Sequence, residues 1–161
     1  ELLCHENQLT ALDLTHNTAL ATVYCPNNRL TALDLSKNTA LATLACSRNQ
    51  LTALDLSQNT AITELYCNNN QLAALDLSRN TALTELYCNG NRLTTLDLSR
   101  NTELTKIYCD DNPLTELNIS NLSKIEEIVF GDNPEINVIA NSQTVVSDEV
   151  RHYMDGKRKT P

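Results

Sequence analysis

The sequence is poor in the residues that build tight turns and aromatic cores. Its 161 residues include three glycines, one phenylalanine and no tryptophan. Glycine turns and large aromatic side chains therefore cannot organise the interior, and leucine must do so. A hydrophobic content of 41% in this length is enough for one continuous core and not comfortably enough for two. We expect a single body.

Positive charge is also scarce, and long apolar runs are missing. The sequence contains 12 Lys and Arg residues and 20 Asp and Glu residues, which gives a formal net charge of -8. Nucleic-acid binding relies on clustered Lys and Arg that displace counterions from phosphates, so a nucleic-acid partner is not expected. No stretch approaches the roughly 20 consecutive apolar residues that span a bilayer, so this segment is not expected to insert into a membrane.

The cysteines reveal an internal repeat. Each lies 21 residues from the next, at Cys4, Cys25, Cys46, Cys67, Cys88 and Cys109. The unit around each cysteine reads L-x-x-L-x-C-x-x-N-x-L, followed by x-x-L-D-L-S-x-N-T-x, and is complete from Leu83 to Thr102. Evenly spaced units of this kind indicate a solenoid.

An asparagine follows every cysteine position by three residues. The row is Asn7, Asn28, Asn49, Asn70, Asn91 and Asn112, and it reaches Asn133 in a seventh unit where Phe130 takes the place of the cysteine. A side-chain amide has both donors and an acceptor, so it can satisfy backbone groups left unpaired where a strand becomes a loop. We interpret this row as a structural ladder; sugar binding by the asparagines is the competing interpretation.

The hydrophobic periods predict the fold. Leu65 and Cys67 alternate with outward residues, which is strand periodicity, and identical strands stacked in register form a parallel sheet. The apolar residues of the return segment are too irregularly spaced for a long amphipathic helix. The prediction is an α/β-class leucine-rich-repeat solenoid, curved and right-handed, with the parallel sheet on its concave face and extended or 3₁₀ turns on its convex face.

The repeats also suggest a division of the chain. We expect residues 1–136 to form the repeat array, with about seven strands and a truncated N-terminus. Residues 137–161 are expected to be the remnant of a C-terminal cap and a linker.

The cysteines, aspartates and remaining asparagines have structural explanations. The cysteines occupy successive inward positions with parallel Cβ vectors, which favours a ladder of free thiols over the alternative of disulfides. A line of single cysteines offers zinc one ligand per turn. The L-D-L-S aspartates and the asparagines after them fit turn chemistry. Calcium is the alternative, but the chain lacks the glycine-rich pattern of repeat calcium sites. We predict no metal and no cofactor.

Catalytic motifs are missing as well. The sequence has no nucleophile elbow, no phosphate-binding loop and no His-Glu-x-x-His. We therefore predict no catalytic residues and no enzyme activity.

The candidate binding residues lie beside the cysteines on the outward face. The residue before each cysteine position is Leu3, Tyr24, Ala45, Tyr66, Tyr87, Tyr108 and Val129, and we call this set the tyrosine row. A strand spacing near 4.8 Å places Tyr66, Tyr87 and Tyr108 in a stripe about 10 Å long. The predicted ligand-binding set is Tyr24, Glu64, Tyr66, Asn68, Glu85, Tyr87, Asn89, Lys106, Tyr108 and Asp110. The competing interpretation is that the rings only pack across strands, worth roughly 0.2–1 kcal/mol per pair.

The stretch from Leu93 to Thr102, continued from Leu104 to Asn112, resembles the repeats of the internalin J-like family of bacterial leucine-rich-repeat surface proteins. The likeness covers about residues 2–133 and rests on the period, the cysteine, both asparagines and the L-D-L-S turn. It implies an extracellular or bacterial cell-surface location, a reduced cysteine ladder and a repeat face that contacts a host or bacterial surface ligand. The sequence departs from the family by lacking a recognisable N-terminal cap, an immunoglobulin-like following domain and an anchor motif.

Together these features predict a non-catalytic binding module that contacts a protein partner through the concave face. Two alternatives stay open. One is a rigid spacer that displays another domain, which the near-identity of the repeats favours. The other is carbohydrate-surface binding, because sugars also pack on aromatic rows, so a glycan is the second candidate partner.

Overall fold

The structure is a computed structural model, and it describes residues 1–131 and 136–140. Asn133 and most of the predicted 137–161 segment lie outside the described residues. The strands are β1 (Leu2–Leu3), β2 (Thr22–Tyr24), β3 (Thr43–Ala45), β4 (Glu64–Tyr66), β5 (Glu85–Tyr87), β6 (Lys106–Tyr108), β7 (Glu116–Asn118), β8 (Glu127–Val129) and β9 (Asn137–Ile139).

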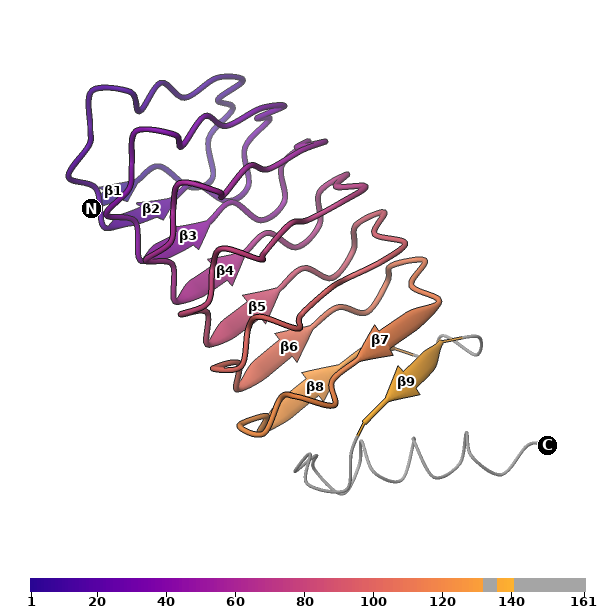
Figure 1. The fold of residues 1–161 in the computed structure, drawn as a ribbon. Helices are drawn as coiled ribbons and strands as arrows, with labels where there is room; N and C mark the ends of the chain where they lie inside the picture. The colour runs from indigo at the N-terminus through magenta and orange to yellow at the C-terminus, as the bar shows by residue number, and fades with distance from the viewer. Residues whose placement is uncertain (132–135, 141–161) are drawn as a thin grey trace.

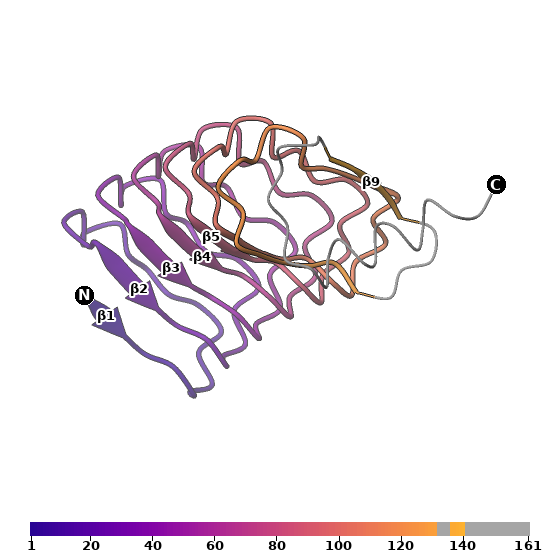
Figure 2. The same ribbon diagram turned by 90° about the horizontal axis from the view of Figure 1, so that it is seen from below.

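One strand per turn builds a parallel sheet along the molecule. Its seven strands follow the order β1-β2-β3-β4-β5-β6-β8. The register equals the sequence period, so Leu65 pairs with Leu86 and Leu86 with Ile107. Figures 1 and 2 show the strands side by side along one face of the coil, with the return segments on the other. The predicted leucine-rich-repeat solenoid with a parallel sheet is confirmed.

The return segments are extended and turn-like. Among the residues that the structure describes no helix occurs, so these segments are extended turns, as the sequence predicts. At the C-terminal end, β7 and β9 pair as a second, two-stranded parallel sheet, with Leu117 opposite Val138. This sheet carries the repeat register past residue 136; the domain boundary at that point stays a prediction.

Leucine, isoleucine and cysteine side chains fill one continuous core. Cys67 and Leu65 are fully buried, as is every other cysteine except Cys4, which is half-buried. All six cysteines are free. Burial penalises the thiolate and raises the pKa of Cys67 to about 12. In this core the cysteine is a small hydrophobic side chain.

The asparagine at each strand exit joins successive turns. Asn70 donates from Nδ2 to the carbonyl of Cys46 in the preceding turn and to that of Cys67 in its own turn, both at 3.1 Å. Its Oδ1 accepts from the Leu51 amide at 3.0 Å. The same bonds recur at Asn28, Asn49, Asn91 and Asn112. Asn7 is exposed and bonds only within its own turn.

The second asparagine row behaves differently from the local turn bonding that the sequence suggests. Asn80 is fully buried, and its Nδ2 donates to the carbonyls of Leu56 and Asn59 in the preceding turn. Asn38, Asn59 and Asn101 repeat this arrangement. These asparagines bond between turns because their side chains are buried in the core, where the preceding turn supplies the acceptor carbonyls.

The aspartates of the L-D-L-S turns do bond locally. Asp76 is exposed, and its Oδ1 accepts from the Ser78 amide at 2.9 Å. Hydrogen bonds from the Ser78 hydroxyl and then from the Ser78 amide hold the pKa of Asp76 below its usual value. In the sixth unit Asn118 replaces the aspartate and caps Ser120 at 3.0 Å. The row has a structural role.

Each strand leaves the sheet through a residue in the left-handed conformation. These residues are Glu6, Asn27, Arg48, Asn69, Gly90 and Asp111, two positions after each cysteine. At Gly90 a Cβ would lie 2.7 Å from Oδ1 of Asn69, so glycine relieves a close contact there. The sequence gives no signal for this conformation, because only one of the six residues is glycine.

We predict that Asn70→Ala lowers the free energy of unfolding by about 2–4 kcal/mol, because it removes inter-turn hydrogen bonds and leaves buried backbone groups unpaired. Asn7→Ala is the matched control, since its side chain is exposed and bonds only locally. Urea unfolding of both variants measures the difference. Equal losses would contradict the ladder.

We predict that the thiols are reduced and protected. Denaturation without reductant should release six titratable thiols, whereas the native chain at pH 8 should react quickly only at half-buried Cys4.

Thiol burial also predicts a pH dependence. Burial raises the pKa of Cys67 to about 12 in the folded chain, whereas the usual value for a free thiol is 9.0. The free energy of unfolding should therefore be at its full value below pH 9 and should fall as the pH rises toward 12, because the unfolded chain loses this proton first. A free energy of unfolding that does not change between pH 9 and pH 12 would contradict this pH dependence. Fewer than six thiols on denaturation would contradict the reduced ladder.

Candidate functional site

The outward side of the seven-stranded sheet, which we call the sheet face, carries the candidate binding residues. Glu64 and Tyr66 lie on β4, Glu85 and Tyr87 on β5, and Lys106 and Tyr108 on β6, with Tyr24 apart on β2. Asn68, Asn89 and Asp110 follow the buried cysteines where these strands end. All these side chains are at least partly accessible to solvent. Strict register brings residues that are 21 apart in sequence side by side.

Three tyrosines of the row form a continuous stack. The ring centroids of Tyr66 and Tyr87 lie 4.8 Å apart, and those of Tyr87 and Tyr108 lie 4.5 Å apart with an interplanar angle of 10°. Parallel strands impose this spacing, because each ring projects from the same position of its strand. The stack presents half-buried aromatic surface with polar edges, which is suited to a macromolecular interface.

Glutamate carboxylates accept hydrogen bonds from the Tyr66 and Tyr108 hydroxyl groups. The Tyr66 hydroxyl donates to Glu85 at 3.2 Å and more weakly to Glu64 at 3.4 Å. The Tyr108 hydroxyl donates to Glu127 on β8. This bond and the neighbouring negative charge raise the pKa of Tyr108 to about 12, so the phenol stays neutral at physiological pH. Sequence reasoning missed Glu127, although its position 21 residues after Lys106 marked it.

Lys106 is the single cation among the predicted binding residues, and it is paired. Its Nζ lies 2.8 Å from Glu85, and this bond raises the pKa of the lysine. Asp110 is partly buried, and desolvation raises the pKa of its carboxyl. Glu64 and Glu127 add further carboxylates, so this part of the sheet face is acidic and disposed toward cationic partners.

Tyr24 does not join the stack, because Ala45 of β3 stands between it and Tyr66. The Tyr24 ring makes an edge contact with His5, with centroids 5.4 Å apart. A hollow of about 500 Å³ lies at this break, lined by Tyr24, Pro26, Asn27, Thr43, Ala45, Ser47, Arg48, Glu64 and Tyr66. The predicted residues therefore divide into one stacked group and one detached tyrosine.

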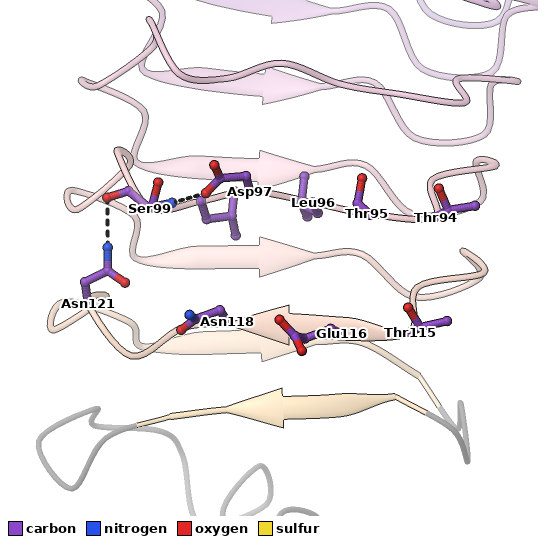
Figure 3. Close-up of a pocket in the computed structure, with 10 residues that line it drawn as sticks. Thr94, Thr95, Leu96, Asp97, Ser99, Thr115, Glu116, Asn118 and Asn121 are labelled. Atoms are coloured by element: carbon purple, nitrogen blue, oxygen red, sulfur yellow. Dashed lines mark hydrogen bonds between the residues drawn. The ribbon is translucent and has the colours of Figure 1, made fainter.

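A second hollow lies between the return segments of two successive turns. It measures about 280 Å³ and is lined by residues 94–99 with Thr115, Glu116, Asn118 and Asn121 (Figure 3). Asp97 caps the Ser99 amide, and Asn121 donates to the Ser99 carbonyl at 2.8 Å. These polar groups serve the turns themselves, and none of the predicted binding residues lines this hollow.

Within residues 1–131 and 136–140, no group of three or more His, Cys, Asp or Glu residues is placed to hold a metal ion. The same part of the chain contains no helix that is long and apolar enough to cross a bilayer.

Several solved leucine-rich-repeat structures resemble this chain. The functional domain of InlJ from Listeria monocytogenes, described as including a cysteine ladder, superposes with a TM-score of 0.86 at 35% sequence identity. The match covers 89% of this chain and 32% of the InlJ chain, so the chain spans about a third of that protein's length. The chain is a leucine-rich-repeat protein that resembles InlJ.

Other comparisons agree. A family model described as Leucine Rich repeats (2 copies) matches residues 60–101. The leucine-rich effector YopM from Yersinia pestis is 27% identical with a TM-score of 0.71, over 84% of this chain and 38% of its own. The internalin InlF from Listeria monocytogenes, at 18% identity and a TM-score of 0.75 over 88% of this chain and 46% of its own, shares the fold. A search of curated proteins finds no match.

Proposed function

We propose that this internalin J-like chain is a non-catalytic protein-binding module that engages its partner through the sheet face. Leucine-rich-repeat proteins of this type generally bind proteins. The observation that carries the proposal is the half-exposed stack of Tyr66, Tyr87 and Tyr108 set among carboxylates. Aromatic side chains of this kind supply much of the binding energy at protein interfaces.

The distribution of sequence variation supports binding over a purely structural spacer. Core and turn positions repeat nearly unchanged, as in Leu75-Asp76-Leu77 and Leu96-Asp97-Leu98. The sheet face changes from turn to turn: Thr43, Glu64, Glu85, Lys106 and Glu127 occupy equivalent positions. A selective surface requires such variation. Exposed positions on the return segments, such as Lys37, Gln58 and Arg79, vary too, but they carry no aromatic row.

The acidity of the face narrows the class of partner. Glu64, Asp110 and Glu127 have no lysine or arginine among the ion pairs of the described residues, while Lys106 is held by Glu85. A partner with basic residues would meet complementary charge and gain in association rate. Resemblance to internalins extends the proposal to a bacterial protein that is secreted or displayed on the cell surface, with a host or bacterial surface protein as its partner.

The test is affinity capture from host-cell and bacterial surface extracts with the wild-type chain and with Tyr87→Ala/Tyr108→Ala. Each interface tyrosine is worth about 2 kcal/mol or more, roughly a thirtyfold loss of affinity when truncated. We therefore expect the double variant to lose the captured protein while its melting temperature falls by only a few degrees.

Gln58→Ala/Arg79→Ala is the matched control, because both residues are exposed on the return segments. It should retain the partner. Full capture by the tyrosine variant would place the site elsewhere, and unfolding of that variant would support the packing interpretation. Binding to a glycan array by the purified chain, with no protein captured, would support the carbohydrate alternative.

A further inference from the structure

The tyrosine row is interrupted at a single place between Tyr24 and Tyr108. Ala45 stands where the neighbouring strands carry Tyr24 and Tyr66, and this residue, which is only 3% exposed, lines the hollow. Tyr24 contacts His5 on its far side. On the other side of Tyr66, the Tyr87 ring stacks at 4.8 Å. The hollow therefore lies where the next planar group of the stack would stand.

The hydrogen-bond register shows what a group in that place would meet. Tyr66 donates its hydroxyl to Glu85, and Tyr108 donates to Glu127, in each case a glutamate 19 residues further along the chain. The same step from Ala45 leads to Glu64, which lines the hollow. Its carboxylate receives only a long bond of 3.4 Å from Tyr66. An aromatic wall and an acceptor with spare capacity thus converge on the hollow.

Charge selects among the planar side chains that would fit. A phenol ring matches the shape but leaves the negative charge of Glu64 uncompensated. A guanidinium group stacks on aromatic faces and forms paired hydrogen bonds with carboxylates. Glu85, the neighbouring carboxylate, is already engaged by Lys106 at 2.8 Å. Arg48 lines the hollow but is exposed.

We propose that the hollow over Ala45 is a specificity pocket for an arginine side chain of the partner protein, with its guanidinium stacked on Tyr66 and paired with Glu64. This inference rests on the proposed protein binding through the sheet face, and it names the residue type that the face selects. A lysine lacks the planar group, and a neutral ring lacks the charge.

The test uses a phage library of random dodecapeptides, panned over the whole immobilised chain. Three proteins are compared: the wild type, Ala45→Tyr, which fills the hollow, and Val129→Tyr, which adds the same side chain at the other end of the row. Peptides retained by the wild type and by Val129→Tyr, but depleted at least tenfold on Ala45→Tyr, should be enriched in arginine. Melting temperatures establish that the variants fold. If Ala45→Tyr does not fold, Ala45→Leu replaces it as the smaller substitution.

A selected peptide then separates stacking from charge. Replacing its arginine by lysine keeps the charge and loses the plane, while citrulline keeps the plane and loses the charge; each should weaken binding about tenfold. Glu64→Gln should weaken the arginine peptide by a similar factor and leave the citrulline peptide nearly unchanged.

Three outcomes would overturn the pocket. These are equal retention of peptides by Ala45→Tyr, enrichment of tyrosine or acidic residues instead of arginine, and equal affinity for the arginine and lysine peptides. Failure of the pocket is distinguishable from failure of the proposed function. Peptides retained by Ala45→Tyr but lost by Tyr87→Ala/Tyr108→Ala would leave sheet-face binding standing without the arginine pocket.

Discussion

The side-chain amide at the strand exit is the constraint on which this molecule depends. Where the chain leaves a strand, backbone carbonyl and amide groups lose their partners in the sheet, and a buried polar group without a partner is costly. Asn70 satisfies two carbonyls and one amide at once, in its own and the preceding turn. Because these bonds join consecutive turns, they fix the register as well as the local fold. A change in repeat length would break them, so the 21-residue period persists.

Fixed register allows the sheet face to work as a surface of repeated positions. Once every turn is held in the same way, the residue before each cysteine always projects beside its equivalent in the next turn. Tyrosines at three consecutive positions then stack without further adjustment. Ala45, the one interruption between Tyr24 and Tyr108, helps to line a hollow together with Tyr24 and Tyr66. In a regular array, one small residue at a repeated position is thus enough to leave a hollow lined by aromatic rings and a carboxylate.

Much of the architecture could be predicted because it follows from periodicity. The cysteine spacing gives the period, and the alternation of Leu65 and Cys67 with polar residues gives the sheet and its inward side. The burial of the second asparagine row was not predicted, because a lone Asn80 in a polar turn resembles a local cap. The acceptors that bury it belong to another turn, and sequence shows them only once the stacking distance is known.

The candidate site was predictable in composition but not in its connections. The tyrosine row can be found directly from the repeat, and so can the neighbouring Glu64 and Glu85. The pairing of Glu85 with Lys106, the part played by Glu127 and the hollow at Ala45 depend on side-chain directions across strands. Phe130 marked where the repeat drifts, yet its drift did not reveal that β7 and β9 would form a second sheet.

Amide hydrogen exchange in Asn70→Ala tests most directly whether the asparagine amides hold the turns in register. The Leu51 amide donates to Asn70, whereas the Leu30 amide donates to Asn49 one turn away. The account predicts that Leu51 loses protection by a large factor while Leu30 retains it, because the opening is confined to the turn that lost its side-chain acceptor. Unchanged protection of Leu51 would contradict the account and show that core packing alone sets the register.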